Sequence, residues 1–121
     1  MARSILDEDH IHPAVRDAIS NSHADTVNKV KAAVAANAVV IVGMGQNPFP
    51  KHAKRILDAK HIRYTYLEFG NYLSGWRRRN AIKMWTGWPT LPMVFVKGVL
   101  IGGAADLARL EASGELKKML A

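Results

Sequence analysis

Residues 38–50 read AVVIVGMGQNPFP and contain a buried strand followed by the start of a helix. The run 38–42 is apolar at every position and rich in β-branched residues, which is typical of a central strand covered on both faces. Asn47 is a good N-cap residue and Pro48 suits a first helical turn, so we expect a helix over 48–60. This strand, loop and helix order predicts an α/β fold.

Hydrophobic periodicity predicts the elements that follow this stretch. We expect a strand at 64–69, a helix at 72–85, a hairpin of strands 93–97 and 100–101, and a last helical region at 105–120. The first two strands should be parallel and the hairpin antiparallel. The sequence therefore predicts a mixed four-stranded sheet flanked by helices, which is the thioredoxin-like architecture.

Within the expected helix at 72–85, the spacing predicts one packed stripe and an arginine-rich outer face. The expected stripe comprises Leu73, Trp76, Asn80, Ala81 and Met84. The three tryptophans, Trp76, Trp85 and Trp88, could stack on nucleic-acid bases beside the arginines, but their helical and pre-proline positions favour core packing.

The chain upstream of residue 38 predicts two helical segments within 13–36, separated by a break at 20–22. Residues 1–12 are expected to form either an arm that orders on contact or a frayed end. We therefore divide the chain into an N-terminal helical extension, 1–36, and a second unit, 37–121.

Composition limits the chemistry of this protein. The chain of 121 residues contains no cysteine, so its own side chains cannot perform thiol–disulfide exchange, which needs a thiolate nucleophile. The net charge of +7, from 17 Lys and Arg against 10 Asp and Glu, favours acidic partners. No apolar run spans a bilayer and the N-terminus lacks a secretory apolar region, so we expect a soluble cytoplasmic protein without membrane partners.

Three motifs between residues 38 and 120 resemble the glutaredoxin family in their order and spacing. They are VVIVGMGQNPFPK at 39–51, WPTLP at 88–92, and KGVLIGGAADL at 97–107, continued by SGEL at 113–116. The resemblance implies the glutaredoxin fold for 37–121. Two features are more similar to the single-thiol branch of the family than to the two-thiol branch: Lys83 ahead of Trp88-Pro89-Thr90, and the hairpin at Lys97-Gly98.

The same resemblance shows where the redox residues of the family are replaced. The attacking cysteine matches Asn47, and the second cysteine of two-thiol members matches Pro50. The lysine that helps to hold the thiolate matches Met44. Residues alone suggest a simple role for Asn47, which is to cap a helix.

The resemblance also implies a glutathione or peptide site that depends mainly on the backbone. Thr90, Leu91 and Pro92 are similar to the segment around the cis-proline of the family, which pairs with an extended peptide or glutathione. The segment that receives the γ-glutamyl end matches Gly103, Ala104, Ala105 and Asp106. Arg79 and Lys83 are similar to the basic residues that pair with a carboxylate, although exposed basic side chains on a helix are often only solvated.

We therefore expect a non-catalytic binding or regulatory module with at most a weak glutathione or peptide site, no required cofactor, and a possible protein partner. A first alternative is the glutathione-linked electron transfer of the family, in redox homeostasis, through a bound thiol cofactor. A second is binding of an acidic partner or a nucleic acid through Arg77–Arg79 and the helix that carries Lys51, Lys54 and Arg55.

No metal site is expected from the sequence. An iron–sulfur cluster needs thiolate ligands, so none is expected in the manner of the family. The histidines show no ligand spacing with carboxylates; they are His10, His12, His23, His52 and His61.

Overall fold

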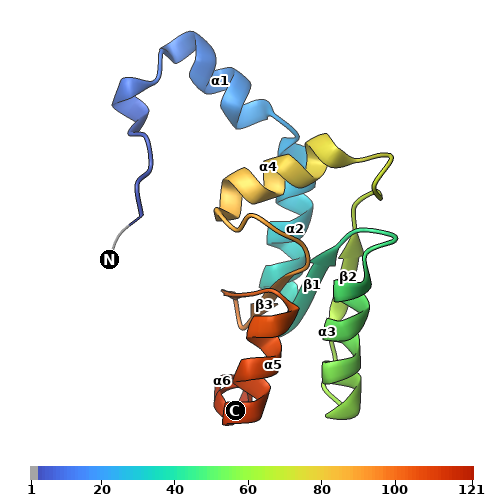
Figure 1. The fold of residues 1–121 in the computed structure, drawn as a ribbon. Coiled ribbons are helices and arrows are strands. Elements are labelled where there is room, and N and C mark those ends of the chain that lie inside the picture. Colours follow the sequence, from blue (N-terminus) through green and yellow to red (C-terminus); the bar gives the residue numbers. More distant parts are fainter. Residues whose placement is uncertain (1–2) are drawn as a thin grey trace.

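A four-stranded sheet lies at the centre of the protein in the computed structural model, which describes residues 3–121 (Figure 1). The strands are β1 (Val39–Gly43), β2 (Thr65–Glu68), β3 (Met93–Val96) and β4 (Val99–Gly102), in the order β2-β1-β3-β4. β1 runs parallel to β2, whereas the β1/β3 and β3/β4 pairs are antiparallel. The predicted mixed sheet is therefore confirmed.

Helices cover both faces of this sheet. The helices of the described chain are η1, a short 3-10 helix (Glu8–His10), α1 (Pro13–Asn21), α2 (Ala24–Ala36), α3 (Pro48–Ala59), α4 (Trp76–Thr86), α5 (Ala104–Ser113) and α6 (Glu115–Leu120). α2 and α4 pack on one face, and α3, α5 and α6 pack on the other. Within residues 3–121, no helix is both long and apolar enough to cross a membrane.

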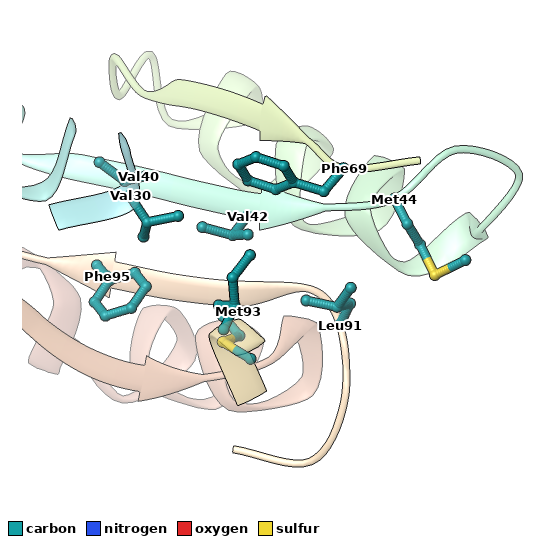
Figure 2. Close-up of a cluster of buried hydrophobic side chains, with 9 residues drawn as sticks. Val30, Val40, Val42, Met44, Phe69, Leu91, Met93 and Phe95 are labelled. Atoms are coloured by element: carbon teal, nitrogen blue, oxygen red, sulfur yellow. The ribbon is translucent and has the colours of Figure 1, made fainter. Parts of the chain in front are cut away.

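The central strand β1 is buried on both faces because its side chains alternate between two cores. Val40 and Val42 pack with Val30 of α2 and Phe95 of β3, as Figure 2 shows. Val39 and Ile41 belong to the opposite cluster, which includes Leu57 of α3. Every residue of β1 is buried, which explains why its sequence is apolar without interruption.

The two N-terminal helices differ in how they pack. α2 buries Thr26 and Val30 against the rest of the molecule, whereas α1 has no buried residue. Figure 1 shows α1 projecting away from the sheet. Residues 1 and 2 of the expected extension lie outside the described residues.

The prediction for α4 was wrong in two respects. The helix begins at Trp76, because residues 70–75 form a turn in which Gly70 and Gly75 have left-handed backbone angles that an α-helix does not contain. The packed face was also misassigned: Arg79, Ala81 and Ile82 are buried, and Ala81 alone was expected to be. The other members of the expected stripe are exposed, namely Leu73, Trp76, Asn80 and Met84.

Candidate functional site

A cavity of about 440 Å³ opens where four segments meet near the C-terminal end of β1. The segments are the loop from β1 into α3, one position of α4, the chain leading into β3, and the start of α5. Its lining residues are Met44, Asn47, Phe49, Lys83, Trp88, Pro89, Thr90, Leu91, Pro92, Gly103, Ala104, Ala105 and Asp106. The fold thus brings most of the sequence-predicted site residues together.

Asn47 occupies the loop end of this cavity and caps α3 as predicted. Its side-chain oxygen accepts the backbone N–H of Phe49 at 3.0 Å, and Pro48 is the first residue of the helix. The amide nitrogen makes a long contact, 3.5 Å, with the carbonyl oxygen of Leu91 across the cavity. A neutral carboxamide therefore stands where a reactive thiol would need to be, and it is not a nucleophile.

Pro50 does not line the cavity. It is buried at the start of α3, and a Cβ added at Gly43 would lie 2.9 Å from the Pro50 ring and from the ring of Tyr66. Pro50 therefore packs against the end of β1 rather than facing a ligand. Only glycine fits at position 43 without displacing these two rings.

The segment before β3 forms one wall of the cavity. The peptide bond between Leu91 and Pro92 is cis, as the resemblance implied. Trp88 packs beside the core, and its indole N–H is buried without a hydrogen-bond partner among residues 3–121. Nothing in the sequence pattern indicated this unpaired donor.

The start of α5 forms the opposite wall. The carboxylate of Asp106 accepts the backbone N–H of Gly103 at 2.9 Å and also pairs with Arg109. Leu107 donates its N–H to Gly103, so the N–H groups of Ala104 and Ala105 precede the first intrahelical bond. These N–H groups carry partial positive charge and favour an anion.

Lys83 and Arg79 have different roles in the structure, although the sequence suggested the same role for both. Lys83 is half-buried and lines the cavity, so its ammonium group is available to a carboxylate. Arg79 is not part of the cavity wall: only 7% of it is exposed, and its guanidinium donates to the carbonyl oxygens of Phe69 (2.9 Å) and Ser74 (2.6 Å). Arg79 therefore holds the turn before α4, and the expected pairing with a ligand carboxylate does not fit this geometry.

In the part of the chain that the structure describes, the charged side chains form neither a metal site nor a shared nucleic-acid surface. Within residues 3–121, no group of three or more His, Asp or Glu side chains is arranged to hold a metal ion. The two basic groups expected to form one nucleic-acid surface lie on α3 and α4, which cover opposite faces of the sheet. Burial of Arg79 removes one of their members. The geometry therefore gives the nucleic-acid alternative no support.

A mixed four-stranded sheet with helices on both faces and a cis-proline before the third strand defines a protein of the thioredoxin-like class. Sequence comparison identifies the family within this class. The Glutaredoxin family model matches residues 39–101. The chain is 43% identical over 98 residues to a glutaredoxin-like protein of Dictyostelium discoideum, across 81% of this chain and 80% of that one. The chain therefore belongs to the glutaredoxin family.

Solved structures agree with this assignment. The chain superposes on oxidized glutaredoxin 2 of Chlamydomonas reinhardtii with a TM-score of 0.71 at 30% identity, covering 82% of this chain and 94% of that one. A buckwheat glutaredoxin–glutathione complex matches with a TM-score of 0.73 at 26% identity, covering 82% and 90%. The thioredoxin-like glutaredoxin fold predicted from the sequence is confirmed.

Proposed function

We propose that this glutaredoxin-family protein is a non-catalytic binding or regulatory module whose cavity accepts glutathione or an extended peptide weakly. One observation supports this most directly: the cavity walls are assembled, but the loop position matching the attacking cysteine holds Asn47, in a chain without cysteine. The buckwheat relative that was solved with glutathione makes this tripeptide the first ligand to test.

The cavity offers suitable partners for a ligand with an anionic group at each end. The ammonium group of Lys83 suits one carboxylate. The N–H groups of Ala104 and Ala105 at the start of α5 suit the other. The apolar walls between these groups include Trp88 and Leu91.

Binding should be weak because two anchoring contacts of the family are absent. Met44 supplies no charge where the family has lysine, and Asn47 cannot form a mixed disulfide. Losing a charge-assisted contact costs roughly 1.5–3 kcal/mol, which is about tenfold or more in affinity. The long contact of Asn47 with the Leu91 carbonyl also competes with a ligand for that acceptor. We expect a dissociation constant of about one millimolar.

A titration of the protein with glutathione, followed by amide and indole chemical shifts, tests the proposal. Shifts should concentrate at 88–92 and 103–106, and Lys83→Gln should weaken binding about tenfold. Lys97→Gln, which removes an exposed lysine from the β3–β4 hairpin, serves as the matched control and should change nothing. Absence of shifts at several millimolar glutathione would mean that this cavity has lost the ligand.

The family itself favours the alternative, a glutaredoxin-type oxidoreductase role. That role needs a thiol from outside the chain. A glutathione-coupled disulfide reduction assay separates the two: we expect no turnover above the rate without protein, and turnover by pure protein would support the alternative. By the same reasoning, anaerobic reconstitution with glutathione should not load an iron–sulfur cluster, because the chain has no thiolate ligand.

We also propose that the site lies wholly within the unit 37–121, with 1–36 as a helical extension. All the residues that line the cavity fall between Met44 and Asp106, which supports the proposal. We propose as well that the chain is closer to the single-thiol branch of the family, because Lys83 and the Trp88-Pro89-Thr90 segment resemble that branch.

A further inference from the structure

The turn between β2 and α4 holds large apolar side chains in solvent. Leu73 is 90% exposed, Tyr72 is 64% exposed, and Trp76, the first residue of α4, is 56% exposed. Figure 1 shows this connection at the rim of the molecule, where β2 leads into α4. Large exposed apolar side chains that gather in one place are a feature of interaction surfaces, and here three lie within five residues.

Hydrogen bonds define the conformation of this turn and hold its apolar side chains outward. Asn71 and Ser74 exchange backbone hydrogen bonds of 3.0 and 3.3 Å, and the Asn71 side chain accepts the N–H of Leu73 at 2.8 Å. The buried guanidinium of Arg79 also donates a hydrogen bond to the Ser74 carbonyl oxygen. A side chain presented on a turn held by hydrogen bonds loses little conformational entropy when it binds.

Two arginine side chains next to these apolar residues have no acidic partner among residues 3–121. Arg77 and Arg78 are exposed, the first turn of α4 has no acidic residue, and neither arginine forms an ion pair among residues 3–121. The Arg77 guanidinium lies 5.1 Å from the centre of the Trp76 ring. The N-terminal end of a helix already carries partial positive charge, so carboxylates from a partner would relieve repulsion there.

We propose that this surface, called the docking patch and made of Tyr72, Leu73, Trp76, Arg77 and Arg78, binds an acidic segment of a protein partner that also carries an apolar side chain. The apolar side chain would pack against Leu73 and its neighbours, and the carboxylates would pair with the two arginines.

A protein segment suits the patch better than a nucleic acid does. The most exposed apolar side chain of the patch is Leu73, which cannot stack on a base, and only two of the three successive arginines are exposed. The patch is separate from the cavity, yet it adjoins the loop that leads to Asn47, since Gly45 donates its N–H to Gly70 at 2.7 Å. A docked segment would therefore lie beside the mouth of the candidate site.

Synthetic peptides provide the probe. One set is rich in glutamate and contains a single Leu, Phe or Trp; a second set replaces glutamate by glutamine; a third replaces the apolar residue by serine. A short uridylate RNA is titrated in parallel. We expect the first set alone to bind, with dissociation constants of about 10–100 µM and chemical shifts at 71–78. Binding that is equal for the glutamine set, tighter for RNA, or absent for every peptide would overturn the proposal.

Matched variants locate the binding. Leu73→Ser and Arg77→Glu should each weaken the peptide by about tenfold or more, because each removes a central contact. Leu6→Ser, at another apolar position that is 64% exposed, and Lys117→Glu, at another exposed cation, should leave it unchanged. Equal effects from the two pairs would refute the assignment. Because Lys83→Gln should not affect peptide binding, failure of the cavity proposal and failure of this one can be told apart.

Discussion

A cysteine placed at position 47 should become an activated thiol, since the structure already prepares that position for a negative charge. The Asn47 side chain accepts the Phe49 N–H at 3.0 Å, so a thiolate in Asn47→Cys would have the same donor and would lie at the positive end of α3. Pro48 and Pro50 provide no further N–H in that turn. A single donor and the helix dipole are worth about 1–2 kcal/mol, or roughly one pKa unit.

We therefore expect the pKa of the thiol in Asn47→Cys to fall from about 8.5 to about 7.5. The rate of alkylation by iodoacetamide, measured against pH, gives this value. Asn37→Cys is the matched control, because Asn37 follows the C-terminal end of α2, where the dipole disfavours a thiolate. A pKa in Asn47→Cys equal to or above that in Asn37→Cys would refute the reasoning. It would mean that α3 does not stabilise an anion at its start.

Three other residues, Arg79, Gly70 and Tyr66, provide further tests, the first two with a matched control substitution. Arg79→Met should cost about 3 kcal/mol of unfolding free energy in a denaturant titration, because two carbonyl groups lose a charged donor, whereas Arg78→Met should cost under about 0.5 kcal/mol. Gly70→Ala should destabilise the protein by about 2 kcal/mol or more, because the new Cβ would clash with the Ser74 carbonyl at a position with left-handed backbone angles. In the control Gly98→Ala the Cβ meets open space, so we expect a loss of only about 1 kcal/mol. Equal losses in the two variants would contradict this reasoning. Burial, with the hydrogen bond to Glu68, raises the pKa of Tyr66, so the folded state keeps a proton that the unfolded chain releases. Its contribution to stability should be present below about pH 10 and decline at higher pH, and Tyr66→Phe should show a shallower decline in alkaline denaturation.

The sequence predicted those parts of the fold that depend on neighbouring residues alone. The apolar run at 38–42 predicts a strand with two covered faces, and Asn47 followed by Pro48 predicts a helix start; β1 at Val39–Gly43 and α3 from Pro48 confirm both predictions. The residues of the cavity were predicted from the family resemblance. No spacing rule in the sequence relates Thr90–Pro92 to Gly103, because only the folded sheet brings these two segments together.

The buried face of α4 was beyond prediction for a different reason. Three successive arginines look alike in sequence, and helical periodicity does not say which of them meets the core. The choice of Arg79 depends on two carbonyl oxygens, of Phe69 and Ser74, whose positions follow from the turn before the helix. The exposure of Trp76 follows from the same turn, which starts the helix later than the apolar pattern indicated.

The complete burial of β1 has a consequence for the motions of the candidate site. Amide hydrogens in the middle of a sheet exchange with solvent only when the whole domain opens, so β1 should exchange among the slowest parts of the chain. The loop that carries Asn47 continues directly from this strand. The cavity wall is therefore connected to a strand that we expect to open rarely, whereas we expect α1, with no buried residue, to fray without disturbing it.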